Sequence, residues 1–307
     1  MEACKGNHLL RKIWESAKRP ILAFLLALAV GGIMIAISGY NPFWVYYQVF
    51  ALAFSSTKNI ASVFAQATPL MFSGIAYAIA AKCGLVNLGL EGQMLSGAMV
   101  SALLGAYLTG LPLIIHLPIA VLGGALAGAF TGGLTAYLKN RFGAREIITT
   151  VMLNEIVALL VSFLCNGPFR AEGSIWGMTE KIQDSAMIAR IIKNTQLTYA
   201  IFLALILGIL LEILLKKSSL GYKMQNYKFI DGFSDSYGWS GISVAALAAY
   251  DPFFSVISAI LFGVLKAGAM ILNRSSNVPK EFVSVIQAFV VVFVAAPRMI
   301  DALLSAK

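Results

Sequence analysis

The sequence predicts an all-α protein that crosses a membrane several times. Of its 307 residues, 59% are hydrophobic and only 12% are charged, whereas a soluble domain carries about 25% charged residues. Charged residues are absent between Arg19 and Lys58, between Lys58 and Lys82, and between Glu91 and Lys139. Because a helix needs about 20 apolar residues to cross the hydrocarbon layer, each of these stretches can hold at least one membrane-spanning helix.

Eight apolar segments are long enough to span the membrane. They are predicted at 20–38, 59–81, 92–109, 113–138, 147–166, 197–215, 253–273 and 282–298. Residues 237–250 are also apolar, but they are too short to span and end at Asp251-Pro252. We therefore expect eight spans plus one half-length, re-entrant segment.

Basic residues predict the orientation of these spans. They gather in alternate connections, namely Lys5, Arg11, Lys12, Lys18 and Arg19, then Lys139, Arg141 and Arg145, then Lys216, Lys217, Lys223 and Lys228. Cytoplasmic loops carry such an excess of Lys and Arg, so the N-terminus (1–19) is expected in the cytoplasm. The net charge of +9 is explained by this pattern, and nucleic acid is not expected as a partner. The apolar run 21–37 is longer than the core of a signal peptide, which predicts an uncleaved first span.

Glycines and prolines punctuate the predicted helices. Gly124, Gly128 and Gly132 form a small-residue ladder that lets helices approach closely, and we expect it to pack within the chain rather than between two chains. Pro69 and Pro118 are predicted as kinks.

The run from Gly84 to Gln93 interrupts the hydrophobic pattern with three glycines, Asn87, Glu91 and Gln93. Lipid does not tolerate unsatisfied backbone, and a carboxylate there is costly, so the break is expected beside protein or water, as in a transporter. Glu91 also suits a helix N-terminus, where the dipole stabilises a carboxylate, and both interpretations stay open. A similar glycine-interrupted segment, 238–245, occupies a matching position in the second half. Two weakly similar halves of this kind point to a translocation site.

Enzyme motifs are not found. The sequence has no P-loop, no GxSxG and no HExxH, and its two histidines, His8 and His116, are too far apart in sequence to suggest a metal pair. Glu155, in the span 147–166, is expected to face the interior of the helix bundle. We therefore predict a transporter rather than an enzyme.

Three runs resemble one family. Asn87-Leu-Gly-Leu-Glu91-Gly-Gln93-Met-Leu-Ser-Gly-Ala resembles the N-[IL]-G-x-E-G-Q-x-x-x-G-A signature of permease subunits in bacterial ABC importers for simple sugars, nucleosides and branched-chain amino acids. The run Glu146-Ile-Ile-Thr-Thr-Val-Met-Leu-Asn154 resembles the purine-nucleoside branch of that family. The run that begins at Gly238-Trp239 resembles the family's G-F-x-G-I-A-V-A-L-L.

The resemblance implies the membrane subunit of an ATP-driven importer for nucleosides or related simple sugars in the bacterial cell membrane. It implies one transmembrane permease domain (1–307) that works by alternating access with a second permease, cytoplasmic ABC ATPases and an external substrate-binding lipoprotein. The chain itself would need no cofactor, because the ATPase binds ATP and Mg²⁺. The pathway residues expected from the resemblance are Asn87, Glu91, Gln93, Asn154 and Trp239. Trp239 suits stacking on a base and a lipid interface equally well.

One departure from the family follows the first six spans (20–215). Leu220, Gly221, Tyr222 and Lys223 would open the segment that couples to the ATPase, but the family pattern stops after residue 225. About 20 residues, enough for one span, and their flanks are absent, which leaves a shortened cytoplasmic loop, 216–236, before the half-helix and two spans of 237–307. Two alternatives therefore remain, namely a carrier or channel that works without ATPases and an internally deleted permease with impaired transport.

Overall fold

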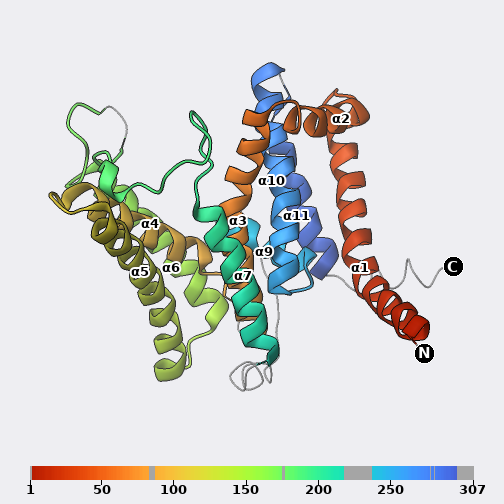
Figure 1. Cartoon of the computed structure of the whole chain (residues 1–307), viewed down its shortest axis with the longest axis horizontal. Helices are drawn as coiled ribbons and strands as arrows, with labels where there is room; N and C mark the ends of the chain where they lie inside the picture. The colour runs from red at the N-terminus through yellow and green to blue at the C-terminus, as the bar shows by residue number, and fades with distance from the viewer. Residues whose placement is uncertain are drawn as a thin grey trace. The chain divides into compact units, whose positions relative to one another are not determined.

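The computed structural model describes residues 2–82, 87–174, 177–217, 237–276, 278–279 and 281–295. Over these residues the regular structure is helical, apart from one antiparallel bridge between Arg190 and Thr198. The chain divides into two compact units, Met1–Gly84 with Arg190–Lys307, and Leu85–Ala189. Figure 1 shows the elements of both units.

Five of the described helices are long and apolar enough to cross a membrane. Their spans are Pro20–Ile37, Thr57–Lys82, Leu113–Phe142, Glu146–Asn166 and Pro252–Ser275, and Ala200–Leu211 and Glu281–Val290 are shorter apolar helices. The predicted class, an all-α multi-pass membrane protein, is therefore confirmed. The total of eight spans, the two similar halves and the orientation of the N-terminus stay predictions.

Unit 1 contains most of the helices. They are α1 (Glu2–Ile37), α2 (Pro42–Ala53), α3 (Thr57–Lys82), α7 (Ala200–Lys217), α9 (Tyr237–Leu247), α10 (Pro252–Ser275) and α11 (Glu281–Ala295). Helices α3 and α10 lie side by side (Figure 1) and run antiparallel, because Gly74 lies against Ser255 while Gln66 lies against Met270. Large buried side chains such as Leu70, Met71 and Phe262 fill the core between them.

The sequence did not lead us to expect α2. It begins where Asn41 accepts hydrogen bonds from the backbone N–H groups of Phe43 and Trp44, with Pro42 in the first helical position. This combination of Asn and Pro is a strong helix start. Tyr46 then donates its hydroxyl to the Leu28 carbonyl at 2.6 Å, and burial raises the pKa of Tyr46 to about 12, so this contact holds α2 to α1 at neutral pH.

The predicted half-length segment is a short helix, α9, with 11 residues. At 1.5 Å per residue it is about 17 Å long, well short of the roughly 30 Å hydrocarbon core. Every side chain from Ser240 to Ala246 is buried or nearly so, which a helix can achieve only when protein surrounds it on all sides. After a turn, Asp251 caps α10 by accepting from Phe253 and Phe254.

Unit 2 consists of α4 (Leu90–Tyr107), α5 (Leu113–Phe142), α6 (Glu146–Asn166) and the short helix η1 (Asp184–Ala186). Helices α3 and α5 continue through Pro69 and Pro118, the two predicted kinks. Helix α5 ends at Phe142, and the next residue, Gly143, has a φ of +65°, which suits glycine just after a helix C-terminus. Helix α6 begins after two further residues.

Candidate functional site

The predicted break in the hydrophobic pattern is a turn that leads into α4. Asn87 and Gln93 join their side-chain amides in two hydrogen bonds, Asn87 Nδ2 to Gln93 Oε1 at 3.3 Å and Gln93 Nε2 to Asn87 Oδ1 at 3.2 Å. Asn87 Oδ1 also accepts from the Gly89 backbone N–H at 3.0 Å. Two of the predicted pathway residues therefore lie together, and their amides hold the turn.

Asn154, from the middle of α6, clamps the same turn. Its Nδ2 donates to the Leu88 carbonyl at 2.7 Å, and its Oδ1 accepts from the Gly92 N–H at 2.8 Å. The first N–H groups of a helix lack partners within the helix, and the residue before α4, Gly89, has no side chain to cap them. Asn154, which is only 5% exposed, thus supplies from a second helix the cap that α4 lacks.

This contact requires glycine at position 92. A Cβ built there would lie 2.8 Å from Asn154 Oδ1 and 3.1 Å from its Cα. Both distances are shorter than ordinary van der Waals contact, so any side chain at position 92 would push α6 away from α4. The glycine of the E-G-Q motif is therefore explained by the close approach of the two helices.

The glycine ladder of α5 supports α4 from another side. Gly124 approaches so closely that a Cβ on it would lie 2.8 Å from the Gly97 carbonyl oxygen of α4. One turn on, a Cβ on Gly128 would lie 3.1 Å from the carbonyl oxygen of Gln93, and one on Gly132 would lie 3.0 Å from its Nε2. The prediction that the ladder packs within the chain is confirmed, and it places the backbone of α5 directly against Gln93.

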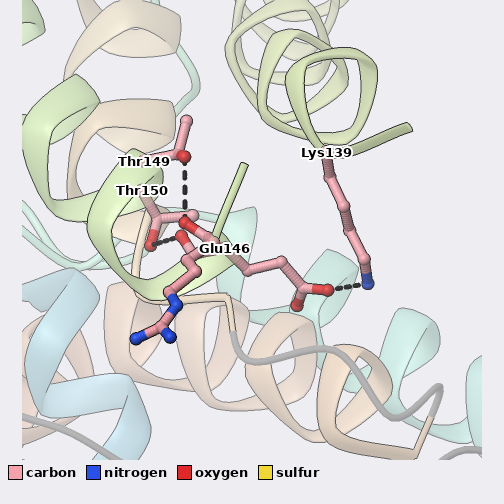
Figure 2. Close-up of polar contacts among 5 residues, drawn as sticks. Lys139, Glu146, Thr149 and Thr150 are labelled. Atoms are coloured by element: carbon pink, nitrogen blue, oxygen red, sulfur yellow. Dashed lines mark hydrogen bonds and ion pairs between the residues drawn. The ribbon is translucent and has the colours of Figure 1, made fainter. Parts of the chain in front are cut away.

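Three residues of α6, spaced by four, organise this region from one helix face. Glu146 forms an ion pair with Lys139 of α5 (Figure 2). Thr150 donates to the Glu146 carbonyl at 2.8 Å, and its Cβ lies 3.4 Å from where a Cβ on Gly89 would stand. Asn154 completes the row. In the run that resembles the nucleoside branch, Glu146 therefore contacts α5, Thr150 packs against the turn before α4, and Asn154 holds that turn by hydrogen bonds.

Glu91 is the second residue of α4, half-buried in its first turn. A carboxylate there is stabilised by the helix dipole, which agrees with the prediction that Glu91 lies at a helix N-terminus. This position leaves Glu91 beside the clamped turn. A role in the pathway stays a prediction for Glu91, and equally for Asn87, Gln93 and Asn154.

The expectation for Glu155 was wrong. Its side chain is exposed on α6, between the exposed Met152 and Ile156. Successive residues of a helix are separated by about 100°, and Asn154 occupies the face of α6 that points to α4. Glu155 therefore points away from the packed side of unit 2.

The remaining predicted site residues lie in unit 1 or outside the described residues. Trp239 belongs to α9 in unit 1, and its side chain lies outside the described part of the structure. Leu220, Gly221, Tyr222 and Lys223, the predicted coupling residues, also lie outside the described residues.

Sequence reasoning missed the structural use of His116. This fully buried side chain of α5 lies 2.7 Å from Ser185 Oγ and 3.1 Å from the Leu104 carbonyl, so it ties α5 to η1 and α4. Among the described residues, no three His, Cys, Asp or Glu side chains are grouped as metal ligands. His116 therefore joins α5 to its neighbours by hydrogen bonds, a role that the sequence around it did not predict.

The buried amide cluster between apolar helices is typical of a multi-pass membrane transport protein. The family described as branched-chain amino acid transport system / permease component matches residues 59–227, more than half of the chain, and the chain belongs to this family. The matched range includes both the turn before α4 and the α6 face that clamps it. Membership also places the chain among membrane transport proteins rather than enzymes.

Similar proteins of known description are ABC transporter permeases. The guanosine ABC transporter permease protein NupP of Bacillus subtilis is 27% identical, with 90% of this chain and 92% of the relative covered. The nucleoside ABC transporter permease protein NupB of Lactococcus lactis is 25% identical, with 93% and 92% covered. A glucose ABC transporter permease protein of Haloferax volcanii is 24% identical, with 91% and 87% covered. No solved structure matches the chain.

The alignments also show a difference in length. The alignment with NupP runs over 325 positions but contains only 90% of the 307 residues, so roughly 50 positions have no residue of this chain. The alignment with NupB, over 336 positions, leaves a similar number. The absence of one span with its flanks after residue 225 stays a prediction.

Proposed function

We propose that this chain is the translocation subunit of an ATP-driven importer for nucleosides. Similarity to a guanosine and a nucleoside permease over about nine-tenths of both chains carries the proposal. The run Glu146–Asn154 supports it, because its sequence resembles the nucleoside branch of the family. A related simple sugar is the alternative substrate, which the similarity to a glucose permease favours.

The proposed mechanism is alternating access in the bacterial cell membrane, with the N-terminus in the cytoplasm. Two permeases, identical or not, would form the pathway, and cytoplasmic ABC ATPases would drive it by binding ATP and Mg²⁺. An external lipoprotein would deliver the substrate. The permease contributes differential binding of the substrate in its two states, and ATP supplies the energy that exchanges them.

The amides of Asn87 and Gln93 are the groups that we assign to the substrate. Side-chain amides both donate and accept hydrogen bonds, as the edges of a nucleobase and the hydroxyls of ribose require. In the present structure the two amides satisfy one another, so a bound nucleoside would exchange these contacts for its own without leaving buried groups unpaired. Glu91 would lie at the start of α4 beside them.

Transport of radiolabelled guanosine tests the proposal. The chain is reconstituted in proteoliposomes with the ATPase and binding protein that co-purify with it, and uptake is measured with and without ATP. We expect ATP-dependent uptake that unlabelled inosine competes and glucose does not. Glu91→Gln and Asn87→Ala should each lower uptake, whereas Lys181→Gln, at an exposed position, should not. Uptake that glucose competes and inosine does not would contradict the nucleoside assignment.

The shorter chain favours a second candidate, a membrane protein that does not work with an ATPase. If the absent segment carried the contact with the ATPase, the chain would be an ATPase-independent carrier or an internally deleted, impaired permease. A pull-down of the tagged chain from native membranes separates these readings. Co-purification of an ABC ATPase supports the importer, whereas uptake that an uncoupler abolishes and ATP depletion spares supports the carrier.

A further inference from the structure

Unit 1 contains a cavity of about 230 Å³ at the end where α3 begins and α10 ends. The two helices are antiparallel, so the first half of α3 lies beside the second half of α10. The segment 194–196, just before α7, closes the cavity on a third side. If the N-terminus is cytoplasmic, α1 crosses once and this cavity opens on the outer side of the membrane.

One face of each helix lines the cavity. Lys58, Ser62 and Gln66 follow one another at intervals of four along α3, and Ala267, Met270 and Arg274 line it from α10. Gln66 Nε2 lies 3.6 Å from Met270 Sδ; along their helices, Gln66 is about two turns from Lys58 and Met270 is about one turn from Arg274. The cavity therefore has two cations at one end and a neutral polar and thioether surface at the other.

The third wall is a fixed turn. Ile191 N–H donates to the Leu197 carbonyl at 2.9 Å, and Thr195 Oγ1 donates to the Ile192 carbonyl at 2.8 Å. At the tip, Asn194 has a φ of +61°, a conformation that asparagine tolerates better than most residues. Asn194 and Gln196, which also line the cavity, thus bring side-chain amides to it from a hydrogen-bonded frame.

The charges around the cavity are all of one sign. Arg274 lies in the last turn of α10, where the helix dipole favours a cation. Lys58 has no such explanation, because it lies in the first turn of α3, where the dipole is positive and no acidic residue is present. Among the described residues that line the cavity, none is acidic. An anion between Lys58 and Arg274 would balance both.

We propose that this cavity binds the phosphate group of an anionic ligand. Arginine and lysine both bind phosphate strongly, and the amides of Asn194 and Gln196 supply further donors. Phospholipid headgroups also carry phosphate, and they lie just outside the hydrocarbon layer, where membrane helices end. The cavity is larger than a phosphate ion. The rest of the ligand, to which the phosphate is attached, therefore extends towards Gln66 and Met270. The phosphate comes either from an anionic phospholipid or from a soluble phosphorylated compound.

The test uses the full chain in phosphatidylcholine nanodiscs. Binding of glycerol 3-phosphate is measured by calorimetry, and retention of phosphatidylglycerol is measured by native mass spectrometry after exchange from mixed lipid. We expect one of the two probes to bind, which identifies the source. Lys58→Gln combined with Arg274→Gln should weaken that binding by about tenfold or more, while Lys181→Gln, an exposed lysine of unit 2, should leave it unchanged.

Ala65→Leu provides a second variant, because Ala65 lines the cavity and a leucine would fill it without changing the charge. We expect this variant also to lose binding. The proposal is overturned if neither probe binds the wild-type chain. Binding of equal strength to the wild type, the double variant and Ala65→Leu would also overturn it, because it would place the phosphate elsewhere.

Discussion

The two units of this chain are held together in different ways. In unit 1, 56% of the apolar window of α3 and 67% of that of α10 are buried, and 28% of that of α1, whereas in unit 2 the share is 17% in both α5 and α6. Unit 1 packs large side chains such as Phe262 and Leu70 against each other. Glycines bring backbones together in both units, for example at Gly263 and Gly268 of α10 and at Gly92 and Gly124 in unit 2. Unit 2, however, buries few large side chains and joins its helices with amide hydrogen bonds.

This difference teaches that each unit should fail in its own way. Between apolar helices in lipid the hydrophobic effect is weak, and association depends on close packing and hydrogen bonds. A unit filled by large side chains is damaged by removing atoms, which leaves a cavity. A unit that has few large buried side chains and depends mainly on close backbone contacts is damaged by adding atoms. The four predictions below test this contrast, from the largest expected effect to the smallest.

The largest effect is expected in unit 1 from Phe262→Ala. The Phe262 side chain is completely buried, and its removal should cost about 3–5 kcal/mol through the cavity it leaves. Thermal unfolding in detergent, followed by the fraction of protein that stays monodisperse, measures this loss. Phe130→Ala in α5, where the side chain is 74% exposed, is the control and should change little. Equal losses would show that burial does not decide stability here.

The next effect is expected in unit 2 from Gly124→Val. Its Cβ would lie 2.8 Å from the Gly97 carbonyl oxygen, and backbone cannot move aside as a side chain can, so we expect a loss of about 2–3 kcal/mol. Gly133→Val, in the same helix with nothing within 4 Å of its Cβ, carries the same change in helix propensity. If both variants have the same melting temperature, the close approach of α4 and α5 is refuted.

Asn154→Ala tests the hydrogen-bonded part of the contrast. The change leaves the Gly92 N–H and the Leu88 carbonyl without their partner, which should cost about 2 kcal/mol. Faster hydrogen exchange at residues 88–93 would locate the loss at the start of α4. Asn166→Ala, which removes a contact with Ser162 of the same helix, should leave that exchange unaltered. If the Asn154→Ala variant shows unchanged hydrogen exchange at residues 88–93, Asn154 does not stabilise the start of α4.

The smallest effect is expected from Lys139→Gln. The ion pair between Lys139 and Glu146 joins α5 to α6 (Figure 2), but Lys139 is 42% exposed, so its loss should cost about 1 kcal/mol or less. Salt screens exposed charges, and the difference in melting temperature between variant and wild type should therefore shrink at high salt. A difference that grows with salt would mean that another interaction of Lys139 is responsible.

The sequence predicted the features that depend on local pattern. The apolar class and the ladder of Gly124, Gly128 and Gly132 followed from composition and spacing. Helix α2 was missed because the charge-free stretch before Lys58 was assigned to a single span, although Asn41-Pro42 was a readable start signal. Helices can therefore be located from the sequence if helix start signals, such as Asn41-Pro42, are considered together with hydropathy.

Contacts between distant residues were beyond the reach of the sequence. The hydrogen bonds of Asn154 join residues more than 60 positions apart, and spacing within one helix cannot reveal them. Glu155 was assigned to the interior because carboxylates are costly in lipid, but its neighbour Asn154 occupies that face. Only the rotation of α6 decides which of the two is inward, and that rotation follows from packing against α4.

The clamp on α4 also sets an order of assembly. Asn154 lies 62 residues after Gly92, so the partner that fixes the start of α4 has not yet been synthesised when α4 enters the membrane. At about 5–20 residues per second, the delay is about 3–12 seconds. Throughout that time the Gly92 N–H and the Leu88 carbonyl need water or the insertion machinery as partners. The turn before α4 is therefore completed only after α5 and half of α6 have followed it into the membrane.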